Sequence, residues 1–272
     1  MRHVDNLEPK QLKMKKIKFK INKHLPVSGR YSYKTDIGKV RLTNEDQASA
    51  TVNAKGDIFL IVCDGMGGQN KGELASSIAV SHLIDDFNSS RFLNTLDVQF
   101  WLNRRIRAVN RYIYNEARQN ALYRGMGTTL TAVVIFKNTV ITAQIGDSRL
   151  YEINGTKLNQ ITKDQTYVNY LYNTGQISKE EMATHPRRHM LMNALGTYPS
   201  VEIDITTKPY VNQTLMLCSD GLYNNVSETT IASILKGRDT PEEKVNELIS
   251  IANNNGGSDN IGLVIWEASY AD

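Results

Sequence analysis

The sequence predicts an α+β fold, because strand-like patterns gather toward both ends of the chain and helical patterns lie between them. A parallel α/β sheet would instead alternate a helix with each strand. The chain has 272 residues and shows no internal repeat or linker, so one large domain is its simplest organisation. We place this domain at residues 29–272, after a basic extension over residues 1–28.

The first half of the domain is predicted to contain strands followed by two helices. The segments YSYKTDIGKVR, from Tyr31, and DQASATVNAKGDIFLIVCD, from Asp46, have strand patterns with glycine-containing turns. Six consecutive apolar residues, Ile58 to Cys63, indicate a strand buried on both faces. Apolar residues three and four apart then predict helices over Glu73–Phe87 and Val98–Gln119.

The middle of the chain is predicted to form a meander of three strands over residues 127–162. Its turns are expected at Lys137-Asn138 and at the hairpin signal Asn154-Gly155. Residues 164–195 are polar and predict short helical pieces, one of which begins with the capping-box pattern of Ser178 and Glu181.

The last part of the chain is predicted to be a strand, a helix and a final strand. The first strand leads to Asp220 and the last ends at Ala268. Between them a helix is expected to begin at Thr240, because Thr240, Pro241 and Glu243 supply its first capping signals.

Composition excludes several classes of protein. Charged residues make up 22% and apolar residues 40%, as in ordinary globular proteins. Much of the net charge of +4 comes from residues 10–24, so the rest of the chain offers no broad basic face for nucleic acid. No apolar stretch is long enough for a membrane helix, and no signal peptide is visible. We expect a cytoplasmic monomer in which the basic extension is a solvated arm.

Four carboxylates stand at ends or breaks of the predicted core strands: Asp64, Asp147, Asp220 and Asp259. Each could cap a helix or sit in an exposed turn, since Asp-Gly is a common turn pair. Their repetition at the same kind of place indicates instead that one fold could bring them together. Converging carboxylates repel one another unless a cation lies between them. Oxygen ligands without a His or Cys cluster suit Mg²⁺ or Mn²⁺ rather than zinc.

Seven motifs, taken in their order, resemble the metal-dependent serine/threonine protein phosphatases of the PP2C family, and most closely its bacterial single-domain members. The motifs are RLTNED (from Arg41), DGMGG (from Asp64), GTTLTAVVI (from Gly127), GDSRLY (from Gly146), HPRRHMLMNALG (from His185), SDGL (from Ser219) and SDNIGLV (from Ser258). The resemblance spans about residues 29–268. It implies a four-layer α-β-β-α sandwich, in which two antiparallel sheets are flanked by helices, with a metal site at one end.

The resemblance also implies a set of metal ligands. Asp64 would bridge two Mn²⁺ or Mg²⁺ ions, and the carbonyl of Gly65 would ligate one of them. Asp220 and Asp259 would complete the other ion's ligands. Asp147, with Asp220, would hold a third, weaker ion, although a structural salt bridge between Asp147 and Arg149 is an equal alternative.

The remaining implied roles concern water, phosphate and protons. Glu45 and Asp46 would hold metal-bound waters, though Glu45 could simply cap a turn. Arg41 would bind the substrate phosphate, because its planar fork matches two phosphate oxygens. Some relatives carry a His as proton donor where this chain has Met66, which leaves the general acid unassigned. A metal-bound water is our first candidate, followed by His185 and His189 if their segment folds over the cleft.

The function implied is hydrolysis of phosphoserine and phosphothreonine on proteins. Asp64, Asp220 and Arg41 would be the catalytic residues, and a hydroxide bridging the two ions would attack phosphorus. Such an enzyme is expected to oppose a Ser/Thr kinase. Two alternatives stay open: a pseudophosphatase that binds a phosphoprotein or kinase with little catalysis, and a phosphatase dedicated to one regulatory phosphoprotein.

Overall fold

The computed structural model describes residues 28–67, 71–155 and 157–269. The basic extension expected over residues 1–28 therefore lies outside the described residues, apart from Ser28. Within the described part of the chain, no helix is long and apolar enough to cross a membrane.

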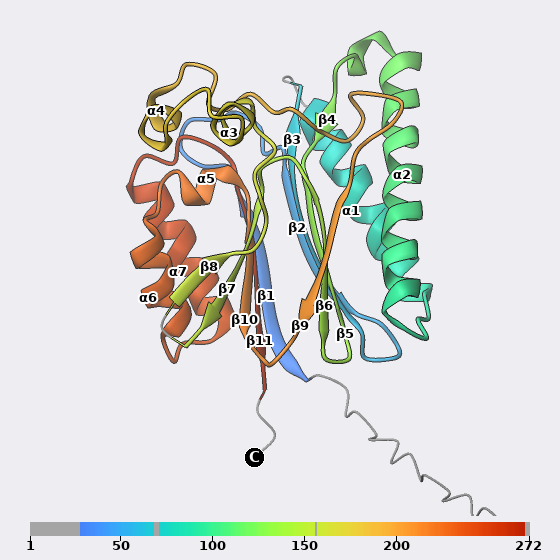
Figure 1. Ribbon diagram of the computed structural model, residues 1–272, viewed down its shortest axis with the longest axis vertical. Coiled ribbons are helices and arrows are strands. Elements are labelled where there is room, and N and C mark those ends of the chain that lie inside the picture. Colours follow the sequence, from blue (N-terminus) through green and yellow to red (C-terminus); the bar gives the residue numbers. More distant parts are fainter. Residues whose placement is uncertain (1–27, 68–70, 156, 270–272) are drawn as a thin grey trace, which may run out of the picture.

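Two sheets, in which every strand pairing is antiparallel, form the centre of the molecule (Figure 1). The first sheet has the order β1-β11-β10-β7-β8 and contains β1 (Gly29–Asp36), β7 (Arg149–Asn154), β8 (Lys157–Gln160), β10 (Thr214–Cys218) and β11 (Ile261–Ala268). The second has the order β2-β3-β5-β6-β9, with β4 paired to β3, and contains β2 (Asp46–Val52), β3 (Ile58–Met66), β4 (Gly127–Thr128), β5 (Leu130–Phe136), β6 (Thr139–Ile145) and β9 (Asp204–Pro209).

Helices cover the outer face of each sheet, which confirms the predicted sandwich. Figure 1 shows α1 (Lys71–Ser89) and α2 (Thr95–Gln119) on one side. On the other side lie α5 (Asp220–Tyr223), α6 (Glu228–Lys236) and α7 (Pro241–Asn254). A short 3-10 turn, Ala121–Tyr123, follows α2.

Three hydrophobic cores fill the spaces between the four layers, and strand β3 contributes to two of them. Phe59, Ile61 and Cys63 pack in the core beneath α1 and α2. Ile58, Leu60 and Val62 belong to the core between the sheets. A third core joins α6 and α7 to the first sheet. Side chains alternate along a strand, so the predicted burial of both faces of this segment is confirmed.

Several helix ends agree with their sequence signals. The Ser178 and Glu181 capping box starts α4 (Lys179–Thr184), and the Thr240 and Glu243 box starts α7. A further box, Asn94 with Asp97, starts α2 and was not predicted. Helix α6 and strand β9 were also not predicted, because they are short and their apolar faces are completed only by packing.

The predicted meander has both of its turns but is wrong in two respects, the first being that β5, β6, β7 and β8 make four strands after the short β4 rather than three. The second is their division between the sheets. Strands β5 and β6 lie in the second sheet, whereas β7 and β8 lie in the first. The chain crosses between the sheets at Gly146, whose φ of +89° favours glycine. A Cβ there would also lie 2.7 Å from the side chain of Thr129. This crossing places Asp147 at one end of the sandwich.

A flap, defined here as residues 167–190, lies between β8 and β9. It contains α3 (Tyr167–Asn173) and α4, which confirms the short helices predicted for this region. The two limbs of the flap meet at its base, where Tyr167 N donates to Met190 O (2.8 Å) and Met192 N donates to Gln165 O (2.8 Å). Figure 1 shows both flap helices at the same end of the sandwich as α5.

Candidate active site

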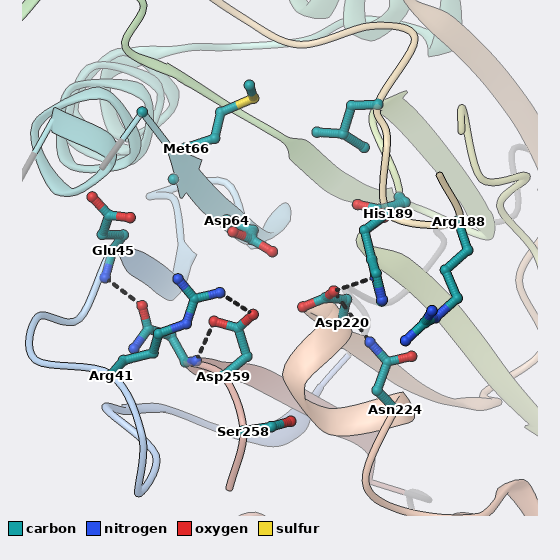
Figure 2. A pocket seen from close by; sticks show the side chains of 15 residues that line it. Arg41, Glu45, Asp64, Met66, Arg188, His189, Asp220, Asn224, Ser258 and Asp259 are labelled. Atoms are coloured by element: carbon teal, nitrogen blue, oxygen red, sulfur yellow. Dashed lines mark hydrogen bonds and ion pairs between the residues drawn. The ribbon is translucent and has the colours of Figure 1, made fainter. Parts of the chain in front are cut away.

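The four predicted carboxylates line one cleft of about 800 Å³. Asp64 comes from β3, Asp147 from the crossing between the sheets, Asp220 from the start of α5, and Asp259 from the loop before β11. Arg41, in the loop between β1 and β2, lines the same cleft (Figure 2). The fold therefore brings together side chains that are far apart in the sequence.

The backbone of Asp64 is fixed by three hydrogen bonds. Its N–H donates to Thr129 Oγ1 (2.9 Å), and its carbonyl accepts from Thr128 Oγ1 (3.0 Å) and Thr129 N (2.8 Å). Within the described residues, no hydrogen bond engages the Asp64 carboxylate, which points into the cleft in Figure 2. This side chain is held in place by its backbone and is available to a ligand.

Gly65 lines the cleft where β3 crosses the start of α1. A Cβ at Gly65 would lie 2.2 Å from the carbonyl oxygen of Gly72 and 2.6 Å from that of Glu45. Its N–H donates to the same Glu45 oxygen (3.1 Å). Close backbone approach therefore requires glycine here. The next glycine, Gly67, has a φ of +134°.

Glu45 and Asp46 lie at the wall of the cleft in different settings. Glu45 lines it, and its Oε1 accepts from Gly72 N (3.1 Å) in the first turn of α1, so the capping alternative is realised in this structure. Asp46 is not among the lining residues and is only 1% exposed. Its Oδ2 accepts from Ser219 Oγ at 2.5 Å, and the same hydroxyl accepts from Gly262 N at 2.7 Å.

The acids of this site raise one another's pKa values. Burial, and then the charges of Asp220 and Asp259, raise the pKa of Asp46 to about 8 against the opposing hydrogen bond from Ser219. Burial followed by the charge of Asp220 raises the pKa of Asp147 to about 7. Burial followed by the charge of Asp259 raises the pKa of Asp220 to about 6. Burial, followed by the charge of Asp46, raises the pKa of Asp64 well above its ordinary value.

This concentration of acid fits a divalent cation. The donors are carboxylate and carbonyl oxygens, which hard cations prefer, and a bound cation would offset both the burial of charge and the mutual repulsion that raise these pKa values. Within the described residues, no three His, Cys, Asp or Glu side chains are already arranged so that they could coordinate one metal ion. One reason is that Asp259 Oδ2 is engaged by the guanidinium of Arg41 at 2.6 Å. Asp259 would have to exchange this partner for an ion.

The salt-bridge alternative for Asp147 is not found among the described residues. Arg149 instead forms an ion pair with Asp164, with Nη2 2.7 Å from Oδ2, and stacks on the ring of Tyr223 with Cζ 3.5 Å from the centroid. Tyr223 in turn donates its hydroxyl to the carbonyl of Asp147 (3.2 Å). The carboxylate of Asp147 lines the cleft and is left for another role.

The two candidate histidines differ in position. His189 lines the cleft, with Nδ1 3.9 Å from Asp220 Oδ2, and Figure 2 shows it pointing toward that acid. Its pKa is lowered, first by burial and then by the charge of Arg188. His185 is not among the lining residues and packs beside Tyr167, with ring centroids 5.9 Å apart.

Sequence reasoning missed the polar residues that support the acids. Besides Ser219, the structure shows Asn260, whose Oδ1 accepts from Glu45 N (2.8 Å) and whose Nδ2 donates to Ile37 O and Thr43 O (2.9 Å each). Asn260 thereby ties the loop that carries Arg41 to the start of β11. The available signal was position, because Ser219 and Asn260 are adjacent to Asp220 and Asp259.

Comparison with known proteins gives a consistent result. The family model described as protein phosphatase 2C matches residues 39–255. The serine/threonine phosphatase stp of Listeria welshimeri is 40% identical over 237 residues, which cover 86% of this chain and 94% of that protein. The structure of the S. agalactiae serine/threonine phosphatase superposes with a TM-score of 0.85 at 34% identity, covering 89% of this chain and 100% of that one. The structure of a PstP catalytic domain in complex with two manganese ions superposes with a TM-score of 0.79 at 33% identity, covering 90% of this chain and 100% of that one.

Proposed function

Because the chain belongs to the protein phosphatase 2C family and is a protein phosphatase, we propose that its cleft hydrolyses phosphoserine and phosphothreonine esters with the help of two divalent cations. The single observation that supports this best is the convergence of four carboxylates on one cleft beside an arginine. The PstP relative solved with two manganese ions supports Mn²⁺ as one of the two candidate cations, Mn²⁺ and Mg²⁺.

We assign the ions to the residues that the sequence singled out. Asp64 would contact both ions, the carbonyl of Gly65 one of them, and Asp220 and Asp259 the other. Asp147 and Asp220 would hold a third ion more weakly. Bound divalent cations supply charge neutralisation and make water more acidic.

Glu45 and Asp46 would act behind these ligands. In our proposal both acids hold metal-bound water, Asp46 from the interior, where it contacts Ser219, and Glu45 at the cleft wall, where it also caps the start of α1. Neither side chain needs to touch the substrate in this role.

Arg41 would bind the phosphate once Asp259 has taken an ion as its partner. The guanidinium side chain is half exposed, and the Asn260 contacts anchor the loop beneath it. When released, it can donate two parallel hydrogen bonds to phosphate oxygens, which a lysine cannot do. The arginine is therefore proposed to orient the ester and to stabilise the charge that develops on phosphorus oxygens.

The leaving serine or threonine oxygen must receive a proton. Water in the cleft remains our first candidate. His189 is the second, because it alone of the two candidate histidines lines the cleft. Replacing His189 by Gln should lower the rate for phosphopeptides more than for p-nitrophenyl phosphate, whose leaving group needs no proton, if the histidine is the donor.

A scaffold without catalysis is disfavoured, because the relatives found are phosphatases and the predicted acids line one cleft. The cellular role is a further proposal: the enzyme would reverse the action of a Ser/Thr kinase. Dedication to one regulatory phosphoprotein stays an alternative, and the cytoplasmic location and monomeric state stay predictions from the sequence.

The test is Mn²⁺-dependent hydrolysis of a phosphothreonine peptide by the wild type and by Asp220→Ala. Asp239→Ala, which changes an exposed acid outside the cleft, is the matched control. We expect turnover that EDTA abolishes and that only Asp220→Ala loses, together with weaker Mn²⁺ binding in calorimetry. Mn²⁺ binding by the wild type without any turnover would contradict the proposal and favour the scaffold.

A further inference from the structure

A second cavity of about 780 Å³ lies between the flap and the body of the protein. Its walls come from α3 and α4 on one side and from the residues of α5 and the start of α6 on the other. Figure 1 shows the two flap helices above α5. Asp147, Arg188, His189 and Asn224 line this cavity and also the catalytic cleft. The two spaces therefore adjoin each other, and we call the second one the flap groove.

The interior of the flap groove has an apolar part formed by flap side chains. Val168 is buried, Met182 is half-buried, and Tyr172 is 44% exposed. Asn169 and Asn173 add amide groups along the same helix, α3. Apolar contacts combined with a few amides suit an extended peptide, whose backbone needs hydrogen-bond partners and whose side chains need surface to cover.

The charges of the flap groove are unbalanced. Arg149 and Asp164 pair with each other and cancel. Lys163 and Lys179 are exposed, and within the described residues neither has a carboxylate within ion-pair distance. The groove is also lined by two further acids, Glu228 at the start of α6 and Asp147, and by a further cation, Arg188. Four basic side chains thus face three acids, so the lining has a small excess of positive charge.

A phosphoprotein substrate must continue away from the cleft on both sides of its phosphorylated residue. In the proposed function the cleft receives the phosphate and the side chain that carries it, and the flap groove adjoins the cleft. We propose that the flap groove binds one flank of the substrate, as an extended segment, and that Lys163 and Lys179 select acidic residues in that flank. This inference rests on the proposed phosphatase function.

The size of the effect follows from the exposure of the two lysines. An exposed ion pair contributes about two- to fivefold to binding, and salt weakens it. Two such pairs should give about a tenfold preference in kcat/KM for an acidic flank at low ionic strength. Because the groove leaves the cleft on one side, the preference should appear for acids on only one side of the phosphothreonine.

The experiment compares phosphothreonine peptides that carry a run of glutamates or of glutamines, on the N-terminal or the C-terminal side. The ratio of kcat/KM for glutamate to glutamine peptides is measured with Mn²⁺ for each protein. Lys163→Glu/Lys179→Glu should bring the ratio below one on the preferred side, and Lys163→Gln/Lys179→Gln should bring it to about one. Lys55→Glu/Lys236→Glu changes the net charge equally at exposed lysines outside the groove and should keep the wild-type ratio.

The outcomes distinguish a failure of the flap-groove inference from a failure of the proposed function. A wild-type enzyme that hydrolyses p-nitrophenyl phosphate and peptides, but shows the same ratio as the groove variants, would overturn the flap-groove inference alone. An equal loss of preference in the Lys55 and Lys236 control would also overturn it, because the effect would then be one of net charge. A wild type that hydrolyses neither p-nitrophenyl phosphate nor any peptide would overturn the proposed function, and this inference with it.

Discussion

The hydroxyl of Ser219 is predicted to be a main support of the acid cluster, and Ser219→Ala tests this. Ser219 is fully buried, and its Oγ joins Asp46 Oδ2 (2.5 Å) to Gly262 N (2.7 Å). The alanine variant leaves a buried N–H without a partner, which costs about 1–3 kcal/mol. It also removes a hydrogen bond to a carboxylate, worth about 1.5–3 kcal/mol when the acid is charged. We expect the metal-free protein to lose about 2.5–6 kcal/mol of unfolding free energy where Asp46 is charged, and about 1–3 kcal/mol where it is protonated.

The loss should depend on pH in a definite direction. The Ser219 hydrogen bond lowers the pKa of Asp46, which burial otherwise raises. Its removal therefore raises the pKa of Asp46 further, and the difference in stability between variant and wild type should be larger above pH 8 than near pH 6. Below that window Asp46 is protonated in both proteins and the charged hydrogen bond no longer contributes.

Urea unfolding of the metal-free proteins, at several pH values, measures both effects. The control is Ser81→Ala, which removes an exposed serine that bonds only to carbonyls of its own helix, and it should change stability by under about 0.5 kcal/mol. If Ser219→Ala cost no more than this control, or if its cost did not grow with pH, the support role would be refuted.

Three further predictions follow from the same contacts. Gly65→Ala should destabilise the protein by more than about 3 kcal/mol in thermal unfolding, since its Cβ would lie 2.2 Å from the Gly72 carbonyl oxygen; a shift of only a few degrees would contradict this. Arg41→Lys should raise KM for a phosphopeptide nearly as much as Arg41→Ala, because a lysine cannot donate in parallel to two oxygens; full rescue by Lys would show that charge alone suffices. The metal-free protein should lose stability as the pH rises from about 5 to 8, because the raised pKa values of Asp147 (about 7) and Asp220 (about 6) keep protons on the folded chain that the unfolded chain has lost. Urea unfolding in saturating Mn²⁺ should show a weaker dependence of stability on pH. A metal-free protein whose stability rose between about pH 5 and 8 would contradict the prediction.

The sequence predicted those parts of the structure whose signals are local. The apolar run Ile58–Cys63 indicates a strand buried on both faces wherever it occurs, and the Thr240 capping box specifies a helix start by itself. The predictions of the sandwich and of the metal ligands came from the ordered motifs and their resemblance to a family, since spacing alone could not bring Asp64 and Asp220 to one cleft. Local patterns also failed to predict the crossing at Gly146, because the choice of sheet depends on pairings with distant strands.

The supports of the site escaped prediction for a related reason. Ser219 and Asn260 are short polar residues that would be unremarkable in any turn. Their function depends on the partners that the fold supplies, such as Asp46 for Ser219 and Glu45 N for Asn260. Glu45 illustrates the same limit, because only the position of α1 shows that its carboxylate caps the Gly72 N–H.

The arrangement separates a rigid half of the cleft from an adaptable one. The backbone of Asp64 is fixed from the core by Thr128 and Thr129, which suits the ligand role proposed for this residue, and Asp46 is held in the interior by Ser219. Arg41 and the flap, in contrast, present exposed side chains from loops and short helices. Cations have one geometry to satisfy, whereas phosphoproteins differ in the residues around their phosphate. Under the two proposals, the same cleft keeps its chemistry constant while substitutions at Lys163 and Lys179 change which flanking sequence it accepts.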